Sequence, residues 1–309
     1  MDSYKSLFII LLLGITFTAC TERIDVQLGS SYTKLVVEGE LSTLPKAYRI
    51  KLSKSSDYFS NKAADPVSDA TVTISDGSNT IQLKESADEK GSYFTPNDYA
   101  GKVGNTYHLV ISNVDINNDG KAESYEATSK IPPVSLLTGV AINYNQAYDF
   151  YKIFMFGYDP GNTEDYYGFR VWVNNKLVSD TITEITTTDD RFFNGNKIEG
   201  LWVQNLYPGK KDEAIQSGSV VTLEVMGITK ECYNFIRDVS HVTNGSNPLF
   251  GSTPANIRGN ISNGAFGFFM TYSSIKASTS NNDTGFSITD VLTKNIASGS
   301  NPLLQRKTP

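Results

Sequence analysis

The sequence has few of the residues on which enzymatic and metal chemistry most often depend. Its 309 residues include two cysteines, Cys20 and Cys232, and two histidines, His108 and His241. Two histidines this far apart do not form a histidine-rich metal motif. The motifs G-x-S-x-G and H-E-x-x-H and a phosphate-binding glycine loop are also absent from the sequence. These absences favour a protein that is not an enzyme.

Long hydrophobic runs and an excess of positive charge are also missing. After the N-terminal segment, no apolar run approaches the ~18 residues that a membrane-spanning helix needs. The formal net charge is −6. This acidic balance argues against nucleic acid, and against an anionic membrane surface, as the partner.

The N-terminal segment has the pattern of an export signal. Residues 1–19 predict a signal peptide, because one lysine precedes an apolar run and small residues precede Cys20. Residues 17–20, FTAC, resemble a bacterial lipobox, in which the chain is cut before the cysteine and that cysteine carries lipid. Phenylalanine at the first position departs from the usual leucine, so the alternative is an ordinary signal peptide. We expect lipidation at Cys20, which leaves Cys232 as a small, buried, unpaired residue.

A polar tether is expected over residues 20–33, directly after the lipidated cysteine. Glu22 and Asp25 lie close to the anchor. Their placement resembles the surface-export signal of Bacteroidota lipoproteins. The alternative interpretation is a simple solvated linker.

The remaining chain predicts an all-β fold. Strand-like alternation recurs about every ten residues over 34–132, with turns such as Asp76-Gly77 between the strands, which is typical of a β-sandwich domain. After Pro132-Pro133, residues 133–275 predict a second, larger β-rich domain. Apolar residues at helical spacing over 229–242 predict one short helix in it. Residues 276–309 are rich in serine, asparagine and threonine and predict a loosely ordered tail.

Several stretches in order resemble one known family. They include LVVEGEL, PVSDATVTISDG, GKVGNTYHLVIS, DYYGFRVWV, DDRFFNGNKIEG and ECYNFIRDV, and the match runs from Cys20 to about Ser273. The chain resembles the domain-of-unknown-function family numbered 4249, Bacteroidota outer-membrane lipoproteins often encoded beside TonB-dependent receptors. The first half also looks like the transthyretin-like or immunoglobulin-like domains of such receptors and their partners. The resemblance implies a location and a TonB-dependent receptor as partner, and it supplies no catalytic residue.

The stretch DINNDGKAESYE, residues 115–126, spells a twelve-residue calcium loop. The ligand positions are filled by Asp115, Asn117, Asp119, Lys121 through its carbonyl, Glu123 and Glu126. Gly120 stands where the sharp turn needs a residue without a Cβ. Strands rather than helices are predicted on both sides, however, and the alternative is a polar hairpin loop. The sequence therefore gives Ca²⁺ as a candidate ligand and names no other cofactor.

Aromatic residues mixed with asparagine and aspartate are the second candidate for binding. They occur in NYNQAYDFY over 143–151 and in DYYGF over 165–169. Tyrosine beside amides suits recognition of sugars or peptides by stacking and hydrogen bonding. The alternative is that strand ends carry tyrosine at a solvated rim.

These patterns together predict a non-catalytic, surface-facing lipoprotein that captures a ligand as an accessory of a TonB-dependent transporter. One alternative is an adhesin or a structural subunit of a surface assembly. A weaker alternative is a hydrolase of surface polymers, with paired carboxylates at Asp189-Asp190 or Glu164-Asp165. Both pairs lie in turn-like stretches, where adjacent acids are usually solvated.

Overall fold

The structure, a computed structural model of the chain, describes residues 33–56, 63–243 and 257–281. The predicted signal peptide, Cys20 and nearly all of the predicted tether, with Glu22 and Asp25, lie outside the described residues. No helix among the described residues has the length and apolar character to cross a membrane.

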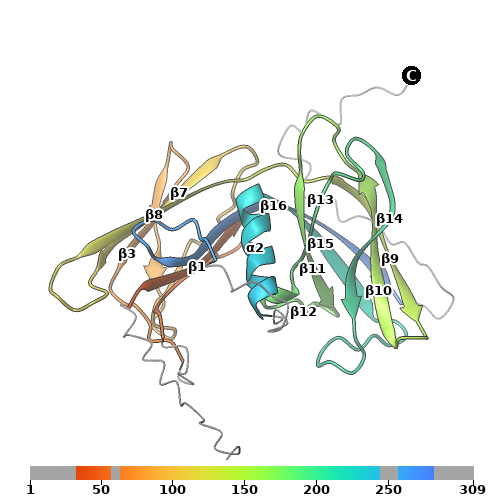
Figure 1. The fold of residues 1–309 in the computed structure, drawn as a ribbon, viewed down its shortest axis with the longest axis horizontal. Coiled ribbons are helices and arrows are strands. Elements are labelled where there is room, and N and C mark those ends of the chain that lie inside the picture. The colour runs from red at the N-terminus through yellow and green to blue at the C-terminus, as the bar shows by residue number, and fades with distance from the viewer. Residues whose placement is uncertain (1–32, 57–62, 244–256, 282–309) are drawn as a thin grey trace, which may run out of the picture. The chain divides into compact units, whose positions relative to one another are not determined.

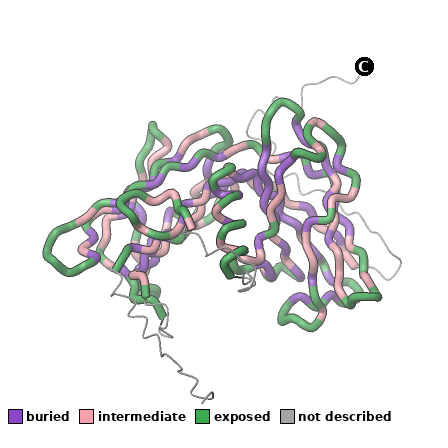
Figure 2. Tube along the Cα trace, viewed as in Figure 1, coloured by how far each residue is buried: buried purple, intermediate pink, exposed green. Residues whose placement is uncertain are grey.

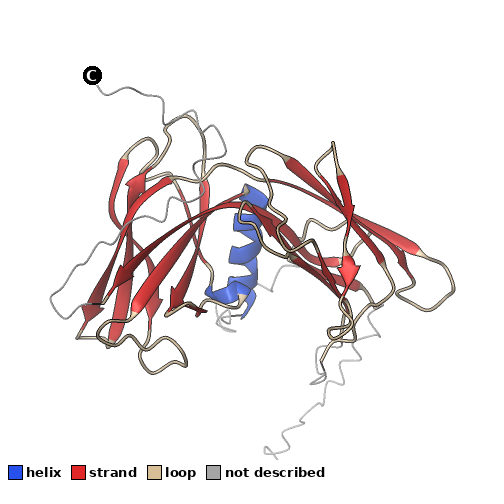
Figure 3. Ribbon diagram, turned by 180° about the vertical axis from the view of Figure 1, so that it is seen from behind, coloured by secondary structure: helices blue, strands red, loops and turns tan. Residues whose placement is uncertain are grey.

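Strands make up nearly all the regular structure of the described residues (Figure 1, Figure 3). The first eight are β1 (Leu35–Ser42), β2 (Arg49–Lys54), β3 (Thr71–Ser75), β4 (Thr80–Gln82), β5 (Lys84–Glu85), β6 (Ser92–Phe94), β7 (Thr106–Val114) and β8 (Glu123–Lys130). The others are β9 (Leu136–Asn145), β10 (Phe150–Tyr158), β11 (Tyr166–Val173), β12 (Lys176–Leu177), β13 (Thr186–Asp189), β14 (Lys197–Leu206), β15 (Val220–Ile228) and β16 (Phe266–Ser280). The all-β prediction is confirmed.

The first half is a β-sandwich. One layer has the strand order β4-β3-β7-β8, and the other contains β1-β2-β6-β5. Buried residues alternate along these strands (Figure 2), as with Val72 and Ile74 in β3. A single hydrophobic core, including Tyr48, Leu109 and Ile111, is enclosed between the layers. The alternation of apolar and polar residues in the sequence therefore identifies the buried face of these strands correctly.

The second half packs a separate three-stranded sheet, β14-β10-β9, against β11, β15 and β16. A second core lies between these sheets, where Ile153 and Met155 of β10 meet Phe169 and Val171 of β11 and Leu223 of β15. Since the inner face of β10 is used for this core, its alternate residues point away from it.

Strand β16 belongs to both halves. Its first part, from Phe266 to Tyr272, pairs in parallel with β1. Its second part, from Ser273 to Ser280, pairs antiparallel with β15. The two predicted domains, 34–132 and 133–275, are therefore joined by one continuous sheet. Residues 276–280, predicted as the start of the tail, are instead in β16, because their backbone pairs with β15; the rest of that tail lies outside the described residues.

The predicted helix is confirmed as α2 (Lys230–Thr243), the one α-helix among the described residues (Figure 3). It buries Cys232, Tyr233 and Ile236 against Met226 and Phe268. Cys232 is free and buried, and burial raises the pKa of its thiol. A short 3-10 turn, η2 (Ile182–Glu184), precedes β13 and is not evident from the sequence.

The segment after the Pro132-Pro133 pair lies tightly against β15. A Cβ added to Gly227 would overlap the carbonyl oxygen of Pro133 and come within 2.6 Å of the Ser273 hydroxyl oxygen. This close approach of two backbones needs a residue without a side chain. The proline pair therefore marks a packed crossing between the two halves.

Candidate functional site

The outer face of the β14-β10-β9 sheet carries a surface of aromatic side chains. Along β10 the residues Ile153, Met155 and Gly157 are buried, while the residues between them are partly or fully exposed. In the register of the sheet, Phe154 faces Trp202 of β14. Aromatic residues from two strands are thus brought to one face by the pleat.

Four of these side chains form what we call the aromatic platform: Tyr148, Phe150, Trp202 and Tyr207. The rings of Phe150 and Trp202 are nearly parallel, at 15°, with centroids 6.3 Å apart. The Phe150 ring also lies 5.7 Å from that of Tyr207 and 6.4 Å from that of Tyr148. Trp202 is 50% exposed and Tyr148 75% exposed. Large aromatic side chains left in water together are typical of a binding surface.

Lys152 crosses this platform. Its ammonium nitrogen lies 4.3 Å from the centre of the Trp202 ring and 5.8 Å from that of Phe150. A cation over the negative face of an aromatic ring is a favourable contact. The lysine therefore fixes the orientation of the rings and brings a positive charge to one side of the platform.

A cavity of about 400 Å³ opens beside the platform and shares Trp202, Asn205 and Tyr207 with it. Its other walls come from η2, β13 and the segment after β14, including Thr183, Thr186 and Glu213. This volume lies within the usual range for small-molecule sites. The aromatic face and the cavity are therefore one continuous surface.

The charges in the cavity wall are paired with one another. The Lys210 ammonium lies 3.4 Å from a carboxylate oxygen of Glu213 and 4.0 Å from one of Glu184. Glu213 is buried and also accepts a hydrogen bond from the backbone N–H of Tyr207, at 2.8 Å. These pairs hold the segment after β14 in place and leave the cavity wall with one carboxylate in excess.

The side-chain amides of Asn205 and Gln204 form hydrogen bonds between the aromatic platform and the cavity wall. The Trp202 indole N–H donates to the side-chain oxygen of Asn205, at 2.9 Å, and the Asn205 amide lies 3.4 Å from the Tyr207 hydroxyl. Gln204 accepts from the Thr186 hydroxyl and donates to the carbonyl of Glu184. Each amide keeps hydrogen-bonding capacity beyond these contacts.

The two aromatic stretches named in the sequence analysis have different places in the structure. From residues 143–151, Tyr148 and Phe150 reach the platform. From 165–169, Tyr167 and Phe169 are core residues. Trp202 and Tyr207 were missed, since only the register of β14 against β10 places them beside Phe150.

Residues 115–122 form the hairpin loop between β7 and β8, and residues 123–126, with Glu123 and Glu126, are the first four residues of β8. The carboxylate of Asp115 accepts backbone N–H bonds from Asp119, at 3.0 Å, and Gly120, at 2.9 Å. The Glu123 carboxylate accepts a hydrogen bond from the Tyr125 hydroxyl, and Glu126 is opposite Val110 in the sheet. Asn117 and Lys121 complete the turn through hydrogen bonds with Asp119. Calcium binding at this loop stays a prediction.

The carboxylates of three aspartates, Asp159, Asp165 and Asp190, lie within 4.8 Å of one another, the one such group among the described residues. All three are buried. The Asp159 carboxylate accepts a hydrogen bond from the Tyr167 hydroxyl, and the Asp190 carboxylate accepts one from the backbone N–H of Asp165. Burial, together with the neighbouring carboxylates, raises the pKa of Asp159 and of Asp165. Asp165 and Asp190 belong to the two acidic pairs named from the sequence, but Asp159, which lies five residues before Glu164, was missed and joins them only in the fold.

The other members of the two acidic pairs make ordinary ion pairs. Glu164 lies 3.3 Å from Lys230, and Asp189 lies 2.8 Å from Arg191. Neither pair presents two carboxylates to an open cleft, so the structure adds nothing in favour of a glycosidase.

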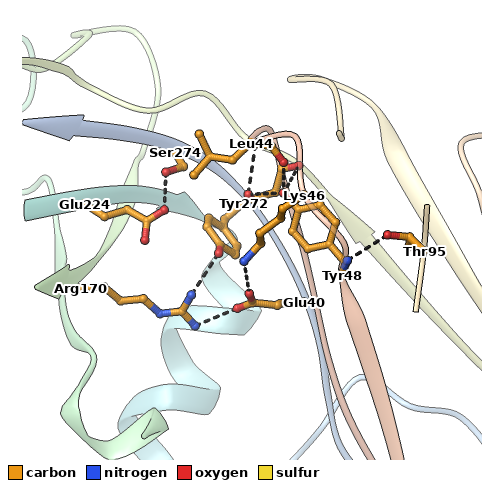
Figure 4. Close-up of polar contacts among 10 residues, drawn as sticks. Glu40, Leu44, Lys46, Tyr48, Thr95, Arg170, Glu224, Tyr272 and Ser274 are labelled. Carbon is orange, nitrogen blue, oxygen red and sulfur yellow. Dashed lines mark hydrogen bonds and ion pairs between the residues drawn. The ribbon is translucent and has the colours of Figure 1, made fainter. Parts of the chain in front are cut away.

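A polar cluster lies where β1, β11, β15 and β16 run together (Figure 4). Arg170 donates to Glu40, at 2.9 Å, and to the Tyr272 hydroxyl, at 3.0 Å. Lys46 reaches the other oxygen of Glu40, at 2.8 Å, and Glu224 accepts from the hydroxyl of Ser274. These contacts are structural, because they fasten the two halves of the chain together.

Comparison with known proteins agrees with this picture at the level of family. No curated protein matches the chain. The sequence profile of domain of unknown function 4249 matches residues 21–278, which cover the sheets described above except for the last two residues of β16. The chain belongs to the domain-of-unknown-function family 4249.

Proposed function

We propose that this protein is a non-catalytic lipoprotein of the outer membrane that captures a ligand on its aromatic platform for a TonB-dependent transporter. Cys20 carries the lipid, residues 20–33 form the tether, and the folded part faces the cell exterior. The resemblance that associates this family with TonB-dependent receptors supports the choice of partner.

The exposed platform is the observation that carries the ligand-capture role. An aromatic cluster left in water costs free energy unless a ligand or partner covers it. Here the rings are supported by a rigid sheet and continue into a cavity. Sites of this kind, built on strands with their side chains held by neighbours, bind without large rearrangement.

Isolation of the protein from native membranes tests the proposal. A tagged full-length chain is solubilised in mild detergent and recovered with its partners. We expect a large outer-membrane β-barrel transporter in comparable amount. The Cys20→Ala chain, which cannot be anchored, is the control and should recover much less of it. Recovery of homopolymers alone would instead favour an adhesin or assembly subunit.

A further inference from the structure

We propose that the aromatic platform and the adjoining cavity form a binding site for neutral oligosaccharides. The inference rests on the proposed function, because it names the chemical class of the captured ligand. Sugar rings would pack against Trp202 and Phe150. A terminal sugar would enter the cavity at the side lined by Asn205 and Tyr207.

The geometry of the rings favours a pyranose. One face of a sugar ring carries several C–H groups, which pack well on the electron-rich face of an aromatic ring. Phe150 and Trp202 are nearly parallel, with ring centroids 6.3 Å apart, and Trp202 is 50% exposed, so its uncovered part can pack against a sugar ring. The rings of Tyr148 and Tyr207 also lie beside Phe150, tilted by 38° and 41°. A longer oligosaccharide would bind more tightly, because each further sugar ring can contact another of these aromatic side chains.

The chemistry of the cavity favours hydroxyl groups over charges. The cavity wall carries one ammonium group, of Lys210, and two carboxylates, of Glu184 and Glu213, so it is negative on balance and disfavours an anionic ligand. Sugar hydroxyls both donate and accept, and they match the side chains of Asn205, Gln204 and Thr183 at the cavity wall. The net charge of −6 also disfavours acidic polysaccharides.

The position of the platform argues against an extended peptide. A peptide that adds to a sheet binds at an edge strand through its backbone. In the three-stranded sheet the edges are β9 and β14, whereas Phe150 and Lys152 lie on the central strand, β10. A strand added at the β14 edge would lie beside Trp202 but would leave Phe150 and Lys152, on β10, uncovered.

Intrinsic fluorescence offers a direct measurement, because the chain has two tryptophans, Trp172 and Trp202. In a Trp172→Phe variant, Trp202 is the only tryptophan and reports on the platform. The full-length lipoprotein is kept in a zwitterionic detergent, since sugar-based detergents would compete. Binding is first surveyed on a glycan array, and then titrated with neutral mannan, xylan and amylopectin and with acidic polygalacturonate.

We expect at least one neutral glycan to bind and to shift the Trp202 emission. Trp202→Ala removes the fluorescent reporter and is therefore compared with the wild type on the glycan array, where binding should weaken at least about tenfold, which corresponds to about 1.4 kcal/mol. Phe192→Ala is the matched control, because Phe192 is an exposed aromatic residue, 93% accessible, outside the platform. It should bind as the wild type does. Tyr148→Ala gives a second test at a more exposed position, should Trp202→Ala lower the melting temperature.

Three results would overturn the inference: no neutral glycan bound, binding to polygalacturonate alone, or equal loss of binding in the Trp202 and Phe192 variants. These results are separable from failure of the proposed function. A transporter recovered with a chain that binds no glycan would remove the carbohydrate assignment only. Glycan binding without any transporter would remove the proposed partner and leave the site.

Discussion

Arg170 of β11 and Glu40 of β1 form an ion pair with a nitrogen–oxygen distance of 2.9 Å, although 130 residues separate them in the sequence. The Arg170 side chain is 14% exposed, and its Nε has no hydrogen-bond partner among the described residues. Tyr272 of β16 completes the contact. The ion pair therefore adds a side-chain contact between two halves that the backbone pairing of β16 already joins.

Glu40→Gln should destabilise the protein by about 2–3 kcal/mol at neutral pH, because it leaves the Arg170 charge without its partner. Burial opposes ionisation of Glu40, but Arg170 and Lys46 outweigh it and lower the pKa of this carboxyl from 4.5 to about 2. A lowered pKa stabilises the folded state above pH 4.5, and this contribution is lost as the pH falls towards about 2.

The measurement is denaturant unfolding of wild type and variant between pH 7 and pH 3. Their difference should shrink as the pH falls below 4.5. Glu38→Gln is the control, since Glu38 is on the same strand in an exposed pair with Lys51 and should contribute at most about 1 kcal/mol. A difference that does not change with pH would contradict the role assigned to the ion pair.

Asp165→Asn should stabilise the protein, and more so at higher pH. Burial has the largest effect and raises the pKa of Asp165; the hydrogen bond from the Thr163 hydroxyl opposes it, and the Asp190 carboxylate adds a lesser rise. A raised pKa stabilises the folded state at low pH, and this contribution is lost as the pH rises through it. The asparagine side chain carries no charge, and its oxygen can still accept the hydrogen bond from the Thr163 hydroxyl.

Thermal melts at pH 8 and pH 4 test this prediction. The Asp165→Asn midpoint should exceed that of the wild type by roughly 2 °C or more at pH 8, and by less at pH 4. The exposed Asp88→Asn serves as the control for loss of one negative charge. A lower midpoint at pH 8 would mean that the ionised group supports the fold.

Gly227→Ala should destabilise the protein by about 1–3 kcal/mol through overpacking, because the new Cβ overlaps the Pro133 carbonyl. Denaturant unfolding measures the change. Gly209→Ala is the matched control, since nothing lies within 4 Å of a Cβ at that position. Equal stability of the two variants would show that the segment after Pro133 moves aside at little cost.

The sequence predicts the local structure better than the long-range structure, for a physical reason. Alternation shows which residues of β3 or β10 are buried, and helical spacing locates α2, because both patterns depend on near neighbours. Nothing local reports that β16 pairs with β1, since that contact joins residues more than 200 positions apart. Phe150 could be found from its tyrosine-rich neighbours, whereas Trp202 joins it only through the register of β14.

The calcium hypothesis for residues 115–126 predicts a melting temperature that depends on calcium. Binding to the folded state alone stabilises it by RT ln(1 + [L]/Kd), about 1.4 kcal/mol at tenfold saturation, or roughly 2–4 °C for a chain of this size. Asp115 already orders the turn through the N–H groups of Asp119 and Gly120. To ligate, Glu126 must turn from its exposed position on β8 towards the loop.

Melts with millimolar calcium and with a chelator, on wild type and Glu126→Gln, decide between a metal loop and a polar turn. A metal loop gives a shift in the wild type that Glu126→Gln abolishes, because the amide cannot act as a bidentate carboxylate, and magnesium should substitute poorly. Glu199→Gln, an exposed change on β14, is the control and should keep the shift. No shift in the wild type means that the hydrogen bonds within the loop maintain the turn without an ion, and a shift that survives Glu126→Gln places the ion elsewhere.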